Sequence, residues 1–239
     1  MATLDGIDVS KYQGTIDWAK VREAGIRFAI LRAGIGSNID SMLKTNLAGC
    51  TAEELPFGFY HFCKSTDTQG AKEEGAAFLE MISGAKPEYP IFCDIELSSQ
   101  TALPAADQLD IVDAFFEEAL EKGFLCGVYS FKANLEKLLT AEPDRLKKYE
   151  IWCAQWGSKN SLEETSGLWQ WSSKGTASGI DTVVDLNIAY KDYPALVREL
   201  GKNGFSKEEA EDCAAIRAER DALAEKIRKI TEILGEETA

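Results

Sequence analysis

Short apolar runs alternate with helical patterns through the first 200 residues of the chain. The runs are nearly continuous in apolar residues, as expected of strands covered on both faces. The clearest helical pattern spans 104–122, where Leu109, Val112, Phe116 and Leu120 form one stripe and Gly123 follows. A shorter helix capped by Asp17 is expected to end at Gly25. Eight strands are predicted, at 6–10, 27–33, 57–63, 90–96, 125–130, 151–155, 167–171 and 183–187.

This alternation of strands and helices predicts an α/β fold, a barrel of the TIM type over residues 1–200. The last three predicted strands leave no room for full helices between them. We therefore expect the closing part of the barrel to be irregular.

The composition changes after residue 204, and 206–234 reads as one charged helix without glycine or proline. Seven positions follow the 3-4 spacing of a heptad seam: Cys213, Ile216, Arg220, Leu223, Ile227, Ile230 and Leu234. The segment 201–239 is thus predicted to be an appended C-terminal helix. It could dock on the flank of the barrel or form a coiled coil in a homo-oligomer, and the pattern favours neither.

The net charge and the cysteines indicate which classes of partner and which cellular compartment to expect. A net charge of −14 argues against a nucleic-acid partner and offers no basic patch for an anionic membrane surface. No apolar stretch approaches the roughly 20 residues that span a bilayer, and the first residues lack the features of a signal peptide. The six cysteines form no C-x-x-C pair, which favours a reduced protein made in the cytoplasm.

Two acidic residues, Asp94 and Glu96, end the apolar run at 90–96. Residues i and i+2 of a strand point to the same face, with Cα atoms about 6.6 Å apart. Two carboxyl groups aimed into one space can protonate a glycosidic oxygen and stabilise positive charge on the sugar. The same pair could also be a solvated strand end or half of a metal site.

The ends of other predicted strands carry further polar and aromatic residues. A TIM-type barrel gathers functional groups at the C-terminal ends of its strands, and crowded carboxylates raise one another's pKa. Aromatic rings suit the apolar faces of sugars, although Tyr60 and Trp171 could equally be core residues. With one histidine, His61, expected to be buried and structural, no zinc site is predicted. The candidates at this mouth are Asp8, Asp94, Glu96, Asp185, Tyr60, Tyr129, Gln155, Trp156, Gln170 and Trp171.

Several ordered motifs between about residues 4 and 190 resemble one family. They are GIDVSKYQG at 6–14, IDW at 16–18, FAILRA at 28–33, GFYHF at 58–62, PIFCDIE at 90–96, GVYS at 127–130, WCAQW at 152–156, WQW at 169–171, GI at 179–180 and VDLN at 184–187. The chain resembles family 25 glycoside hydrolases, the Chalaropsis-type lysozymes of bacteria and their phages. It departs from the family pattern at Tyr12, often a tryptophan, and in the loop 37–42.

The resemblance implies a modified (β/α)5(β)3 barrel that hydrolyses the β-1,4 bond between N-acetylmuramic acid and N-acetylglucosamine in peptidoglycan, with retention. It implies that Glu96 is the general acid and base, and that Asp94 stabilises the charged intermediate by orienting the substrate's own N-acetyl group. Asp8 and Asp185 match the family's other site carboxylates. The implied partner is the peptidoglycan glycan strand, and no metal or organic cofactor is implied.

We expect an endolysin-like enzyme, made in the cytoplasm without a signal peptide and acting on the cell wall after release. The residues leave open whether Asp94 attacks the sugar directly. A non-catalytic wall-binding or assembly protein on a lysozyme scaffold is an alternative, and a chitinase would differ only in substrate.

Overall fold

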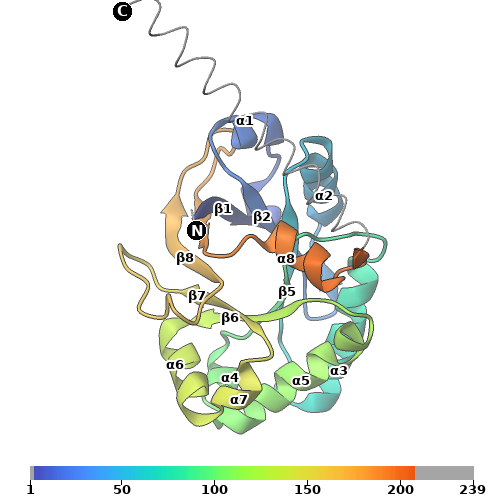
Figure 1. Cartoon of the computed structure of the whole chain (residues 1–239), viewed down its shortest axis with the longest axis vertical. Coiled ribbons are helices and arrows are strands. Elements are labelled where there is room, and N and C mark those ends of the chain that lie inside the picture. Colours follow the sequence, from blue (N-terminus) through green and yellow to red (C-terminus); the bar gives the residue numbers. More distant parts are fainter. Residues whose placement is uncertain (1–2, 208–239) are drawn as a thin grey trace, which may run out of the picture.

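The computed structural model describes residues 3–207 of the chain. The heptad pattern predicted at 213–234 lies outside these residues. The described part forms one closed barrel with helices around much of its circumference (Figure 1).

Eight strands close into the barrel, and each corresponds to a predicted strand. The ring closes because the first strand pairs with both the second and the last. The short β3(Asn38–Ile39), which was not predicted, forms a hairpin on the end of the second strand. The barrel strands are β1(Leu4–Val9), β2(Phe28–Ile35), β4(Phe57–Phe62), β5(Ile91–Asp94), β6(Cys126–Phe131), β7(Glu150–Ala154), β8(Leu168–Gly175) and β9(Val184–Ala189).

One strand runs against the others. Strands β1, β2 and β4 to β8 are parallel to their neighbours around the ring, whereas β9 is antiparallel to both β8 and β1. A regular TIM barrel is parallel throughout. The reversal brings the beginning of β9, rather than its end, to the edge where the other strands finish.

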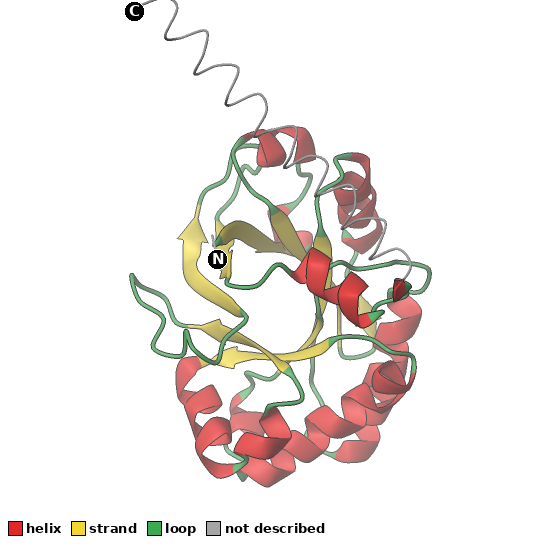
Figure 2. Cartoon of the chain, in the orientation of Figure 1, coloured by secondary structure: helices red, strands yellow, loops and turns green. Residues whose placement is uncertain are grey.

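Helices follow each of the first five barrel strands, and the described residues between β7, β8 and β9 contain none. The predicted (β/α)5(β)3 arrangement is therefore confirmed, and Figure 2 shows helices above, to the right of and below the ring of strands, with none at the left beside β8. The helices are η1(Lys11–Gln13), α1(Trp18–Glu23), α2(Leu43–Ala52), α3(Thr68–Met81), α4(Ser98–Thr101), α5(Ala105–Glu121), α6(Lys132–Ala141), α7(Pro143–Leu146) and α8(Tyr193–Leu200).

Local signals explain two of these helices. Asp17 caps α1 by accepting a hydrogen bond from the backbone N–H of Lys20 at 3.2 Å. The long α5 begins after Pro104 and buries Leu109, Val112 and Phe116 of the predicted stripe, whereas Leu120, the last of its four residues, is exposed near the end of the helix. Both predicted helices therefore form within a residue or two of their expected limits.

Aromatic side chains fill the inside of the barrel. Phe28, Phe92 and Trp152 are buried there, and Tyr193 of α8 packs on Tyr89 with ring centres 5.2 Å apart. The Tyr193 hydroxyl donates to Glu150, the first residue of β7, at 2.6 Å. Helix α8 therefore closes the N-terminal end of the barrel, in front of the ring in Figure 1, and leaves the opposite end for a site.

The chain remains attached to the barrel beyond α8. Asn203 is buried, and its amide donates to the carbonyl groups of Pro87 and Tyr89 at 2.8 and 3.0 Å. Its side-chain oxygen accepts from the backbone N–H of Leu125 at 2.7 Å. None of the helices between residues 3 and 207 has the length and apolar character needed to cross a membrane.

Candidate active site

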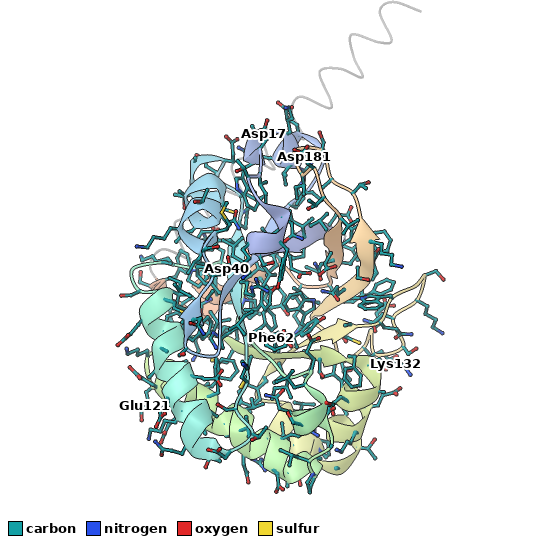
Figure 3. The ribbon with its side chains drawn as sticks, turned by 180° about the vertical axis from the view of Figure 1, so that it is seen from behind. Asp17, Asp40, Phe62, Glu121, Lys132 and Asp181 are labelled. Carbon is teal, nitrogen blue, oxygen red and sulfur yellow. The ribbon has the colours of Figure 1, made fainter. Side chains whose placement is uncertain are left out.

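A cavity of about 390 Å³ opens at the C-terminal end of the parallel strands. All four acidic residues predicted for the site line it, although they come from three strands far apart in the sequence. The view from behind in Figure 3 places Phe62, one of its lining residues, in the middle of the molecule, with Glu121 and Lys132 at the periphery. The lining residues include Asp8, Asp94, Glu96, Asp185, Tyr60, Tyr129, Trp152, Gln170, Arg32, Tyr12 and Gln13.

Asp94 and Glu96 share one face, as the strand spacing predicted. Asp94 is the last residue of β5 and only 3% exposed, whereas Glu96 follows the strand and is exposed at the rim. Ile95, between them, points into the outer core. Its backbone is fixed because its N–H donates to the carbonyl of Tyr129 at 3.0 Å and its carbonyl accepts from the Ser130 hydroxyl.

Asp8 and Asp185 meet from neighbouring strands. They are direct partners in the antiparallel ladder between β1 and β9, and their carboxyl groups share a hydrogen bond. Asp185 was expected at the C-terminal end of its strand; it lies near the beginning of β9 instead, and the reversed direction of β9 brings it to the same rim.

A network of hydrogen bonds holds Asp8, which is 5% exposed. Gln170 and Asn187 both donate side-chain N–H groups to its Oδ2, at 2.9 and 2.8 Å. The Oδ1 atom of Asn187 accepts from the indole of Trp152 at 2.8 Å. These interactions fix the orientation of Asp8 inside the barrel.

Gln170 is the centre of the same network on its other side. Its Oε1 accepts from the Tyr129 hydroxyl at 3.0 Å and from the indole of Trp156 at 3.1 Å. Tyr129 is buried in the cavity wall, while the ring of Trp156 is 65% exposed. Gln170 thus links the interior of the cavity to an exposed aromatic surface.

Burial raises the pKa of all four carboxyl groups, and neighbouring carboxyl groups raise it further for Asp8, Asp94 and Glu96. Burial, and then the neighbouring Asp185, raise the pKa of Asp8 to about 8. Burial, Glu96 and Asp8 raise the pKa of Asp94 well above its usual range. Burial and Asp185 raise the pKa of Glu96 as well, which favours the proton-bearing form of this carboxyl group at the rim.

Tyr60 lines the cavity, and its ring packs edge-on against Trp152. Three other predicted residues, Gln155, Trp156 and Trp171, lie outside the cavity lining. Gln155 does not line the cavity, because its amide exchanges hydrogen bonds with Ser161 in the following loop, at 3.1 and 2.8 Å. Trp171 lies on the outer face of β8 and lines a separate groove with Trp156.

Other residues of the site were not predicted. Asn187 follows Asp185 at i+2, the same spacing that led to Asp94 and Glu96, so the signal was present in the sequence. Arg32 lines the cavity and forms a buried ion pair with Asp40, at 2.7 Å. That pairing depends on the hairpin through β3, which left no pattern in the sequence.

The fold and site together define a class of protein. A barrel of this type with clustered carboxyl groups of raised pKa, aromatic walls and amide side chains is the arrangement of a glycoside hydrolase. Among the described residues, no three histidine, cysteine or acidic side chains are arranged to share a metal ion.

Comparison with known proteins specifies the family. The model of glycosyl hydrolases family 25 matches residues 7–180, and the chain belongs to this family. The autolytic lysozyme of Clostridium acetobutylicum is 27% identical over 187 residues, which are 77% of this chain and 55% of the relative. The chain therefore spans about half the length of that relative.

Solved structures share the fold. The bacterial lysozyme from Streptomyces coelicolor matches with a TM-score of 0.71 and 23% identity, over 86% of this chain and 100% of that chain. The modular autolysin LytC from Streptococcus pneumoniae, solved in complex with a synthetic peptidoglycan ligand, matches with a TM-score of 0.68 and 25% identity. That match covers 79% of this chain and 47% of LytC.

Proposed function

We propose that the protein is a lysozyme that hydrolyses the β-1,4 bond between N-acetylmuramic acid and N-acetylglucosamine in peptidoglycan, with retention at the sugar. Glu96 is the general acid and then the general base, and Asp94 orients the substrate's N-acetyl group. Asp8 and Asp185 shape the cluster of carboxyl groups and position the substrate. The family and the names of its lysozyme relatives support this assignment.

One observation carries the role of Asp94. Its carboxyl group is 3% exposed and lines the cavity, and its Oδ1 has no hydrogen-bond partner within residues 3–207. Buried carboxyl oxygens are normally hydrogen-bonded. The acetamide N–H of a bound sugar would supply the missing donor and would favour the charged form of Asp94.

The reaction then proceeds in two steps. The acetamide oxygen attacks the anomeric carbon while Glu96 gives its proton to the departing glycosidic oxygen. Glu96, now a carboxylate, takes a proton from water as that water attacks the same carbon and the acetamide is restored. Two inversions give net retention, and the exposed position of Glu96 at the rim gives it access to both the leaving group and water.

Product analysis tests the bond specificity. Purified Gram-positive walls are digested, the new reducing ends are reduced with borohydride, and the sugar alcohols are identified. The proposal predicts muramitol; glucosaminitol as the only product would contradict it. Walls stripped of N-acetyl groups should resist digestion and regain sensitivity after re-acetylation, and cleavage of the stripped walls at the full rate would refute the role of the acetamide.

Two alternatives have distinct outcomes in the same assay. A non-catalytic wall-binding protein would sediment with the walls and release no reducing ends. A chitinase would cleave N-acetylglucosamine oligomers in preference to peptidoglycan. Four carboxyl groups gathered in one cavity favour the enzyme, because burying them raises the free energy of the fold without aiding simple binding.

A further inference from the structure

The cavity contains one positive charge that the proposed reaction does not use. Among the described residues that line it, Arg32 on β2 is the one cation, and this residue is only 6% exposed. A buried guanidinium is rarely found without a defined set of partners. The partners of Arg32 therefore indicate what it is placed to bind.

Asp40 occupies only one edge of the guanidinium. Its Oδ2 lies 2.7 Å from Nε and 2.7 Å from Nη2 of Arg32. Nη2 is buried and makes no hydrogen bond of good geometry despite this ion pair, and none of the hydrogen bonds among residues 3–207 involves Nη1. Asp40 is itself fixed, because it accepts the backbone N–H groups of Lys11 and Met42 at 3.1 and 2.9 Å. The guanidinium is thus held rigidly, with one edge left for a ligand.

A second cation lies near Arg32 at the mouth of the cavity. The ring of Tyr12, which is 67% exposed, has Arg32 Cζ 5.0 Å from its centre and Lys11 Nζ 5.5 Å from it. Tyr12 also lines the cavity. Lys11, Tyr12 and Arg32 form an electropositive corner on a chain whose net charge is −14.

We propose that this electropositive corner binds a carboxylate carried by the 3-O substituent of the substrate's muramoyl residue, and so makes Arg32 a specificity-determining residue. The inference rests on the proposed function. A guanidinium edge pairs well with a carboxylate. A polymer of N-acetylglucosamine carries no such group and would leave Nη1 unpaired in a largely enclosed site, which discriminates against it.

Two parts of peptidoglycan can supply this carboxylate. The lactyl group of muramic acid carries it directly when the stem peptide has been removed, and the stem peptide carries others when it is present. If the lactyl carboxylate is the ligand, a reaction that hydrolyses the lactyl amide must act first. The test therefore includes both forms of the substrate.

Binding is measured by calorimetry with the full chain carrying Glu96→Gln, so that turnover does not interfere. The ligands are a peptide-free tetrasaccharide with free lactyl carboxylates, its methyl ester, and the peptide-bearing tetrasaccharide with and without esterified carboxyl groups. We expect the free acid to bind about tenfold more tightly than its ester in at least one of the two pairs. The pair that shows the difference identifies the source of the carboxylate.

Further substitutions, added to Glu96→Gln, then show which residues cause the tighter binding of the free acid. Adding Arg32→Gln should remove it, and adding Lys11→Gln, at an exposed position that cannot disturb the core, should reduce it several-fold. Adding Lys174→Gln, the same charge change in the separate groove on β8, should leave it intact. Equal binding of acid and ester, or a preference that survives both Arg32→Gln and Lys11→Gln, would overturn the proposal.

These results are independent of catalysis. If the chain prefers the acid but never cleaves walls, the proposed lysozyme activity is refuted and the carboxylate-binding role of the electropositive corner stands. If it cleaves walls but binds acid and ester equally, the lysozyme activity stands and the role of the corner is refuted.

Discussion

Asp8 and Asp185 face each other directly across the β1–β9 ladder and share a hydrogen bond between their carboxyl groups. Opposed residues of an antiparallel pair have Cβ atoms about 5 Å apart, and like charges there are destabilising. The pair is therefore tolerated in the fold because a proton lies between the two groups. The close approach of these two carboxyl groups therefore both raises the pKa of Asp8 and lowers the stability of the fold when both groups are charged.

This relationship predicts how stability depends on pH. The pKa of Asp8 rises from 3.8 to about 8 on folding, owing first to burial and then to Asp185. A carboxyl group whose pKa is raised by folding stabilises the fold most at low pH and loses that contribution as the pH rises toward the folded pKa. Asp8→Asn mimics the protonated form and should raise the melting temperature, with a gain that grows between pH 4 and pH 8.

Melting curves of the wild type and Asp8→Asn at several pH values provide the check. Each kcal/mol of difference corresponds to roughly 2–4 °C for a chain of this size. The exposed variant Glu80→Gln on α3 serves as the control and should show no such trend. A gain for Asp8→Asn that is the same at pH 5 and pH 9 would contradict the shared proton.

Asn187 is predicted to position Asp8 together with Trp152. Asn187→Leu removes one of the donors to Asp8 and leaves the buried indole N–H of Trp152 without its acceptor. An unsatisfied buried polar group costs about 1–3 kcal/mol. We therefore expect a lower melting temperature and about tenfold less wall-lytic activity.

A double-mutant cycle separates this role from general damage. Trp152→Phe removes the indole donor while retaining much of the ring. If the two residues act through their hydrogen bond, the losses caused by Trp152→Phe and Asn187→Leu should be clearly less than additive. Simple additivity of the two losses would count against the coupling.

The sequence predicts much of this site, and the limits of that prediction have physical causes. The i, i+2 rule was enough to place Asp94 and Glu96 on one face, because side chains alternate along any strand. It also shows that if Gln170 points inward, Trp171 must point outward, as it does. The direction of β9 could not be read, because an apolar run looks the same whichever way the strand pairs.

Side-chain contacts that depend on a loop could not be predicted from the sequence either. Arg32 and Asp40 are eight residues apart, and only the hairpin through β3 brings them together. Gln155 stands at a strand end, as predicted, but its amide is engaged by the loop that follows. Such contacts depend on loop conformation, which has no periodic signature.

Close packing of α3 on α5 gives a stability prediction remote from the site. A Cβ atom added to Gly75 would lie 2.0 Å from the backbone carbonyl oxygen of Phe115. Since backbone atoms of two long helices cannot move apart easily, Gly75→Ala should destabilise the fold by about 1–3 kcal/mol. Chemical denaturation measures this, with Glu80→Ala on the exposed face of α3 as the control. Unchanged stability of Gly75→Ala would show that the helices are packed less tightly.

The predicted C-terminal helix can be tested by truncation. Because Asn203 is bonded into the barrel, the cut belongs after Lys207 rather than at residue 200. If the segment self-associates, removing it should lower the number of chains per particle while the barrel stays folded with the same melting temperature. An equal number of chains per particle in both forms would indicate docking instead of self-association.

Release of reducing ends from purified walls by the wild type and Glu96→Gln tests the central claim most directly. Because Glu96 is the proposed proton donor at the rim of the cavity, the variant should lose about 10²–10⁴-fold in rate while keeping its melting temperature, and Glu80→Gln should match the wild type. A Glu96→Gln enzyme that cleaves walls at the wild-type rate would contradict the account.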